Sequence, residues 1–232
     1  MRNYLTIDGQ SMKDFGVYIS GSGTFGAPER DIEKQEIPGK NGDVVFDNGR
    51  YKNRPLSYPA FIYENFGVNV EGLRNFLLTH SSNYYRIEDT YHPAEFVLGR
   101  WTGSFEPTME EDLKAGQFEF SFDCKPQRFL KAGEIATDMT ASGNILNPSL
   151  QTAKPLLRVF GTGRFIIGDY TMTITAADEY TDIDCDIQEA YKGTTNCNGN
   201  VQGSYPELVP GTNLVTLDGV TRIIIYPRWW IL

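Results

Sequence analysis

The chain has 232 residues, of which 40% are hydrophobic and 13% aromatic, enough apolar material for one large β domain or two domains of moderate size. Its formal net charge is −9 and no basic cluster is present, which excludes sequence-specific or phosphate-driven binding to nucleic acid. Three cysteines without a C-x-x-C spacing predict reduced thiols, and neither a disulfide framework nor a metal site.

No targeting or membrane segment is expected from the sequence. Residues 1–20 contain no continuous apolar run of the kind found in a signal peptide. No stretch approaches the roughly 20 apolar residues that a membrane helix requires. We therefore expect a protein synthesised in the cytoplasm, with no membrane partner.

Strand and turn signals dominate the start of the chain. The segment after Tyr4 predicts a hairpin that turns at Asp8-Gly9, two residues that tolerate positive φ. Residues 38–54, PGKNGDVVFDNGRYKNR, carry two further turn signals, Asn41-Gly42 and Asn48-Gly49. This polar segment is interpreted as a projecting hairpin or arm and not as part of a core.

One helix is predicted over residues 70–80, VEGLRNFLLTH. Glu71 is expected in its first turn and His80 near its last, both favourable to the helix dipole. The apolar residues that fall on one helical face are Val70, Leu73, Phe76 and Leu77.

Residues 116–124 alternate as a half-buried strand. Phe118, Phe120, Phe122 and Cys124 share one face, and burying each phenylalanine is worth about 2–3 kcal/mol. Cys124 is therefore predicted to be a core residue and not an exposed nucleophile. Pro126 is expected to end the strand, because it lacks a backbone donor.

The composition changes at Gly133, where a segment low in aromatics and rich in Thr, Ser, Ala and Asn begins. The remainder predicts only strands, with no helix. Turns are expected at Gly161-Thr162-Gly163, Gly168-Asp169 and Asp218-Gly219, and GTGRFIIG is interpreted as a hairpin because no helix follows it. Two mainly β domains are predicted, residues 1–132 and residues 133–232.

The candidate catalytic residues do not form a recognisable pattern. His80 and His92 have no metal-ligand spacing and are expected to be surface or capping histidines. The adjacent acids Glu110, Glu111 and Asp112 cannot straddle a scissile bond and are interpreted as a solvated turn. No catalytic residue, cofactor or metal site is predicted, so we expect a protein that is not an enzyme.

The run DIDCDIQE contains alternating aspartates, Asp182, Asp184 and Asp186. A calcium loop of this kind needs Gly and Glu where this chain has Ile187 and Gly193. A strand explains the alternation better, with the aspartates facing water and protecting an edge. The side chains expected to point inward are Ile183, Cys185 and Ile187.

An alternative function rests on the aromatic residues near the C-terminus. Tyr226, Trp229 and Trp230 predict a stacking platform for a sugar, and hence a carbohydrate-binding module for recognition of a host cell surface. Neighbouring residues of a strand face opposite sides, so one indole is expected in the core and the other near the surface.

An ordered series of segments resembles the distal tail proteins of long, flexible-tailed bacteriophages, the siphophage tail component family. The resemblance covers essentially the whole chain, and the arm region and the helix around Leu73 agree in place. The segments that carry it are FEFSFDCKPQRFLKAGE, KPLLRVFGTG, YTDIDCDIQEAY, YPELVPGTNLVTLDG and IIIYPRWWIL.

The resemblance implies a structural protein of the virion tail tip, from a phage or a prophage. Residues 1–132 would be a β-sandwich with one helix that forms a hexameric ring, and residues 133–232 a galectin-like β-sandwich. The ring would join the tail tube protein to the tail-tip protein and a receptor-binding protein, and leave a channel for DNA. The arm residues expected to contact a neighbouring subunit are Asn41, Gly42, Asp43, Asn48, Gly49 and Arg50.

Overall fold

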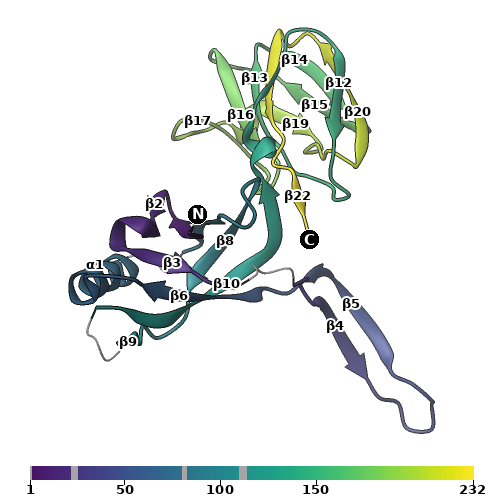
Figure 1. The fold of residues 1–232 in the computed structure, drawn as a ribbon. Helices are drawn as coiled ribbons and strands as arrows, with labels where there is room; N and C mark the ends of the chain where they lie inside the picture. The colour runs from purple at the N-terminus through teal and green to yellow at the C-terminus, as the bar shows by residue number, and fades with distance from the viewer. Residues whose placement is uncertain (1, 22–25, 80–82, 110–113) are drawn as a thin grey trace. The chain divides into compact units, whose positions relative to one another are not determined.

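The structure, a computed structural model, describes residues 2–21, 26–79, 83–109 and 114–232. Over these residues the chain is mainly β with one α-helix, which confirms the predicted fold class. It divides into two compact units, residues 1–128 with Leu232 and residues 129–231 (Figure 1). Each unit has its own hydrophobic core.

A nine-stranded sheet dominates the first unit. In spatial order it contains β2 (Gln10–Ser11), β1 (Leu5–Ile7), β7 (Tyr85–Asp89), β8 (Glu95–Trp101), β10 (Gly116–Leu130), β6 (Arg54–Ile62) and β3 (Val17–Ile19), and β9 (Thr108–Met109) pairs with β10. The ninth strand, β22 (Trp230–Ile231), also pairs with β10 but belongs to the second unit, as do the last two residues of β10. The sheet curls, because Asn3 before β1 bridges to Ile19 in β3, whose N–H donates to the Asn3 carbonyl at 2.9 Å. The predicted turn between β1 and β2 is confirmed, with positive φ at Asp8 (48°) and Gly9 (83°).

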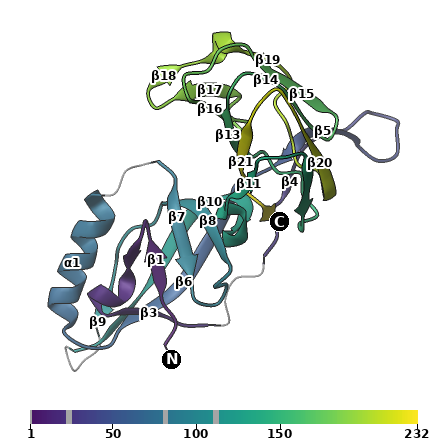
Figure 2. The same cartoon turned by 90° about the horizontal axis from the view of Figure 1, so that it is seen from above.

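Helix α1 (Phe66–Thr79) packs against this sheet near the 3-10 turn η1 (Met12–Phe15) (Figure 2). The helix prediction is confirmed in type, but the helix begins four residues before Val70, so Glu71 lies beyond its first turn. His80 lies outside the described residues. The side chains that α1 buries are Phe66, Val70, Leu73 and Leu77.

The long strand β10 supplies the aromatic centre of the first core. The predicted alternation is confirmed, since Phe120, Phe122 and Cys124 are at most 1% exposed. The prediction that Pro126 ends the strand is wrong, because β10 continues to Leu130. Its last rung with β6 joins Cys124 to Arg54, so Pro126 lies beyond that ladder and its missing N–H breaks no bond there.

Two sheets pack face to face in the second unit. The six-stranded sheet contains β11 (Thr137–Met139), β21 (Arg222–Tyr226), β13 (Leu156–Phe160), β16 (Tyr180–Asp184), β17 (Glu189–Lys192) and β18 (Thr195–Asn196). The five-stranded sheet contains β12 (Gly143–Asn147), β20 (Gly211–Asp218), β14 (Gly163–Ile167), β15 (Tyr170–Ile174) and β19 (Val201–Gly203). Inward side chains of both sheets fill one core, which defines a β-sandwich. Two 3-10 turns, η2 (Lys131–Glu134) and η3 (Asn198–Asn200), complete the unit.

The glycine corners of the second unit connect its sheets. Gly161 follows β13 in one sheet and Gly163 begins β14 in the other, so this turn is a crossover and not part of a hairpin. The hairpin in GTGRFIIG and the residues after it is β14–β15, which turns at Gly168 with φ 55°. A Cβ on Gly163 would lie 2.6 Å from Gly219, so the two crossover corners touch and need glycine.

The expected solvent-facing row of aspartates is confirmed for Asp186, which is exposed, but is wrong for the other two. Asp182 and Asp184 are only 6% and 8% exposed, and β16 lies inside its sheet between β13 and β17. Ile183 and Cys185 point inward as predicted, but Ile187 is 60% exposed because β16 ends at Asp184. The aspartates are covered by arginines, with Arg158 on Asp182 and Arg228 on Asp184.

Candidate functional site: the hairpin arm and its root

A hairpin contributes no residue to either hydrophobic core. Strands β4 (Arg30–Gln35) and β5 (Val44–Tyr51) form a two-stranded sheet of their own, visible in Figure 1, and none of their residues is buried. We call residues 30–51 the arm. The predicted arm is confirmed as a hairpin, although the sequence analysis did not assign its first strand.

The six predicted arm residues occupy two different places. Asn41, Gly42 and Asp43 lie in the turn, where Gly42 has φ 79°. Asn48, Gly49 and Arg50 lie within β5, so the turn predicted at Asn48-Gly49 is wrong.

The second turn signal instead makes a β-bulge. The register shifts here, since Arg30 pairs with Tyr51 but Ile32 pairs with Asp47. Gly49 has φ 70°, and its N–H donates to Asp47 Oδ1 at 2.8 Å. The bulge bends and twists the arm close to its attachment.

Charged residues divide the arm into two halves. Near the attachment, three ion pairs join the two sides: Arg30 with Asp47 at 2.9 Å, Arg50 with Asp31 at 2.7 Å and Lys52 with Glu29 at 3.6 Å. The arginines hold the pKa of Asp47 and of Asp31 below the ordinary value. The proximal half is therefore electrostatically self-contained.

The distal half of the arm carries acidic side chains without ion pairs among the described residues, and exposed apolar side chains. Within the described part of the chain, Glu33, Glu36 and Asp43 form no ion pair. Val45 and Phe46 are each 53% exposed, and as neighbours on one strand they point to opposite faces. Apolar side chains on both faces of a hairpin without a core indicate a surface for another protein.

The root of the arm is held by a buried arginine. Arg54, the first residue of β6, is 6% exposed, and its Nη1 donates to the Gly26 carbonyl at 2.7 Å. The Lys52 N–H also donates to the Glu29 carbonyl at 2.8 Å. These two bonds tie the segment that enters the arm to the segment that leaves it.

Two donors of Arg54 have no partner in the part of the chain that the structure describes. Nε and Nη2 are covered by protein atoms but form no hydrogen bond. Burial and then the neighbouring charge of Arg128 lower the pKa of Arg54. Glu95, a carboxylate that attracts Arg54, is already paired with Arg128 at 3.3 Å.

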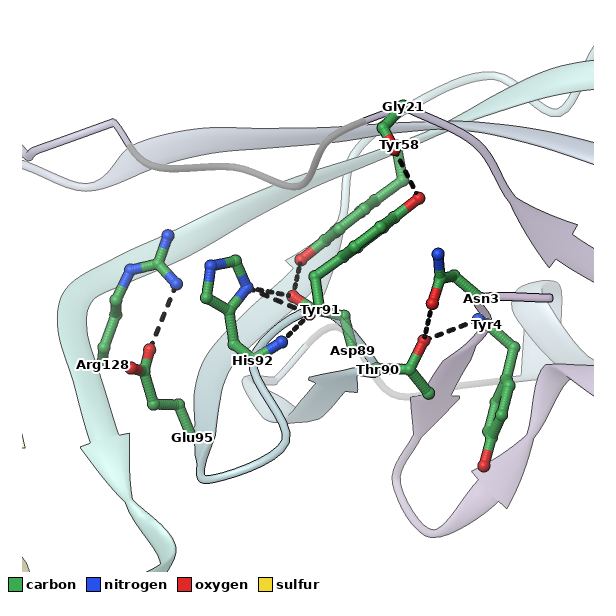
Figure 3. Close-up of polar contacts among 10 residues, drawn as sticks. All are labelled: Asn3, Tyr4, Gly21, Tyr58, Asp89, Thr90, Tyr91, His92, Glu95 and Arg128. Atoms are coloured by element: carbon green, nitrogen blue, oxygen red, sulfur yellow. Dashed lines mark hydrogen bonds and ion pairs between the residues drawn. The ribbon is translucent and has the colours of Figure 1, made fainter. Parts of the chain in front are cut away.

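A polar network lies along the connection from β7 to β8 (Figure 3). His92 Nδ1 lies 3.0 Å from Asp89 Oδ1, the His92 N–H donates to the same oxygen at 2.7 Å, and the Tyr58 hydroxyl donates to Asp89 Oδ2 at 2.7 Å. The Tyr91 hydroxyl donates to the Gly21 carbonyl at 2.8 Å. His92 is thus a loop-capping histidine, and the Asp-x-x-His spacing is the signal that the sequence analysis missed.

The Thr90 side chain joins the same connection to the N-terminal segment. Its hydroxyl donates to Asn3 Oδ1 at 3.0 Å and accepts the Tyr4 N–H at 3.1 Å (Figure 3). The network fixes the β7–β8 connection to its surroundings from several directions.

The same core contains a cysteine, which the sequence raised as a possible nucleophile. The one cysteine of this core, Cys124, is fully buried, and burial raises the pKa of its thiol to about 12. A neutral, covered thiol cannot serve as a nucleophile. No group of three potential metal ligands occurs among the described residues, and none of the helices described there is long and apolar enough to cross a bilayer. Glu110, Glu111 and Asp112 lie outside the described residues.

The three predicted glycan contacts differ in their burial. Trp229 is 5% exposed in the second core, while Trp230 is half-buried and its Nε1–H donates to the Thr152 carbonyl at 3.0 Å. Tyr226 is half-buried on β21, with Leu156 as its cross-strand partner. The core-and-surface split of the indoles is as expected, and the glycan contact stays a prediction.

The described chain is a mainly β protein of two units, with one α-helix and a hairpin that belongs to neither core. No family model matches the chain, and no curated protein does. Among solved structures, the SPP1 Dit protein (gp 19.1), described as a paradigm of the hub adsorption apparatus in phages that infect Gram-positive bacteria, matches with a TM-score of 0.77 and 16% identity, over 100% of both chains.

Two structures of the phage p2 baseplate in its activated conformation are also similar. The calcium form matches with a TM-score of 0.53 and 9% identity, over 97% of this chain and 98% of the other. The strontium form matches with a TM-score of 0.50 and 10% identity, over 97% of both chains. The chain therefore has the fold of a phage distal tail protein.

Proposed function

We propose that this chain is a structural protein of a phage or prophage tail tip. It forms a ring, hexameric in the complete assembly, that joins the tail tube to the host-adsorption apparatus and leaves a channel for DNA. The observation that carries this proposal is the match with the SPP1 Dit protein over the full length of both chains.

The arm supports the ring. A closed ring needs a heterologous contact, in which one surface of a subunit meets a different surface of the next. The arm offers open strand edges and apolar side chains on both faces, here Val45 and Phe46. A neighbouring subunit that pairs with the arm by sheet augmentation, along the segment that includes Asn41 and Arg50, would supply partners for the open strand edges and cover the apolar side chains.

The charge of the chain supports a channel for DNA. The net charge of −9 disfavours binding of the phosphate backbone, so DNA slides past such a surface and is not retained. In this proposal the first unit builds the ring and the second unit, the β-sandwich of residues 129–231, carries the receptor-binding partner.

Negative-stain electron microscopy of the purified chain, alone and co-expressed with the tail tube and tail-tip proteins, tests the proposal. Particles with a central hole are expected. A variant in which residues 33–46 are replaced by a short Asn-Gly turn should fold, because the arm contributes no buried residue to a core. It should form no ring, because it lacks the proposed contact surface. Persistent monomers of the unmodified chain in the presence of both partners would contradict the proposed function.

A further inference from the structure

The guanidinium of Arg54 is a buried charge that forms no ion pair with the described residues of the first unit. It is 6% exposed, has one hydrogen bond and, over the described residues, lacks a partner for Nε and Nη2. A buried cation is costly unless a carboxylate and further hydrogen bonds satisfy it. Arg128 lies in the same region and has what Arg54 lacks, since it is paired with Glu95.

Among the described residues, carboxylates without an ion pair occur on the arm, which carries them away from Arg54 of the same copy. Glu33, Glu36 and Asp43 are the arm acids without an ion pair in the described structure, and all three lie in the distal half. At about 3.3 Å per residue, the eight residues from Arg30 to Ile37 place the end of the arm roughly 25 Å from its root. Because β4 is paired with β5, the distal half cannot fold back onto its own Arg54.

We propose that a distal arm carboxylate of one copy pairs with Arg54 at the arm root of the next copy. The inference deepens the proposed ring and rests on it. The contact joins a tip to a root, so each subunit gives one surface and receives another, which is the heterologous pattern that closes a ring.

The exchange of bonds favours the contact. To meet a carboxylate, the Arg54 side chain turns outward and releases the Gly26 carbonyl, which costs one hydrogen bond to a neutral acceptor. In return the planar fork makes two charge-assisted bonds, which are individually stronger. The same movement releases the segment that enters the arm from Arg54. Binding of the next copy would therefore change how the arm is attached to its own subunit.

Arg54→Met separates this role from a purely structural one. At concentrations where the chain is monomeric, the midpoint of thermal unfolding should stay unchanged or rise, because the variant removes an unpaired buried charge. The concentration at which rings half-dissociate, measured by mass photometry, should rise at least tenfold. Arg128→Met is the matched control. It removes the ion-pair partner of Glu95 and should lower the midpoint of thermal unfolding of the monomer.

Three single variants, Glu33→Gln, Glu36→Gln and Asp43→Asn, identify which arm carboxylate pairs with Arg54. One of them should weaken the ring as much as Arg54→Met does, and the two changes together should cost no more than either alone. If Arg54→Met leaves the ring midpoint unchanged, or if all three acids combine additively with it, the inference is overturned while the ring stands. If the unmodified chain forms no ring with its tail partners, the proposed function and this inference both fail.

Discussion

The pair Arg228–Asp184 allows a quantitative test of the second unit. Arg228 donates to both carboxylate oxygens of Asp184, at 2.7 and 2.8 Å, and the side chains are 33% and 12% exposed. Arg228→Met removes the cation and leaves the carboxylate covered. Breaking a buried pair costs about 3–5 kcal/mol, and the partial exposure of Arg228 lowers our expectation to about 2–3 kcal/mol of unfolding free energy.

A matched control is available in the same sheet. Arg222 likewise donates to both carboxylate oxygens of an aspartate, Asp138, through Nε and Nη2. The two side chains are 41% and 49% exposed. Arg222→Met should cost less than about 1 kcal/mol, because water screens an exposed pair. Methionine at position 228 keeps an unbranched side chain at a backbone φ of 57°, so the comparison does not add a conformational penalty.

Urea unfolding followed by tryptophan fluorescence measures both variants. In a Trp101→Phe background the signal comes from Trp229 and Trp230, which belong to the second unit. The explanation is refuted if the two methionine variants lose the same free energy.

The pH dependence of the same pair has a definite sign. Burial alone would raise the pKa of Asp184, but the hydrogen bonds and charge of Arg228, with the Asp186 N–H, bring it below the ordinary value. A depressed carboxyl pKa contributes stability that is present above the unfolded value, about 4, and is lost as the pH falls through the folded value. In Arg228→Met the buried carboxyl loses its arginine and is protonated more readily, so the difference between wild type and variant should persist at pH 7 and shrink as the pH falls toward about 4 and below.

Three further predictions concern other parts of the structure. Phe120→Ala should lower the unfolding free energy by about 3–5 kcal/mol in urea titrations, because a fully buried ring leaves a cavity; a loss below about 1 kcal/mol would contradict this packing. Burial raises the pKa of Cys124 and Cys185 to about 12, so a thiol reagent at pH 8 should modify only the half-exposed Cys197 in the native chain, and rapid modification of all three would contradict it. Gly203→Ala should lower the thermal midpoint, because φ is 119° and a Cβ would lie 2.2 Å from a neighbouring carbonyl oxygen; an unchanged midpoint would count against this backbone geometry.

Periodicity predicted the elements that border a core. Most side chains of the alternation from Phe118 to Cys124 and of the predicted helix face are buried. Phe118 and Phe76 are partly buried and pack against the same core. In these segments the local pattern and the tertiary environment agree. A sequence pattern therefore suffices where burial decides the conformation.

The arm shows where that reasoning ends. Its first strand, RDIEKQ, has no apolar alternation, because a two-stranded sheet without a core imposes none. The dipeptide Asn48-Gly49 has the composition of a hairpin turn but forms a bulge, since β4 lies opposite on both sides of it. The difference depends on the partner strand, which the dipeptide does not reveal.

Long-range partners were equally hidden. Asp182 and Asp184 look like solvent-facing residues in an alternating strand, yet Arg158 and Arg228, 24 and 44 residues away, cover them. Likewise nothing in the sequence shows that Arg54 is covered while two of its donors have no partner among the described residues. Such features follow from the topology and become visible only when distant strands are placed together.

The strand β10 also has an evolutionary implication. Its residues Phe120 and Phe122 belong to the first core, and Leu130 at its other end packs against the second, without an intervening loop. Modular proteins commonly exchange domains by recombination within linkers, where a cut removes nothing from either side. Here a crossover placed inside residues 116–130 would divide a secondary-structure element whose side chains contribute to both cores.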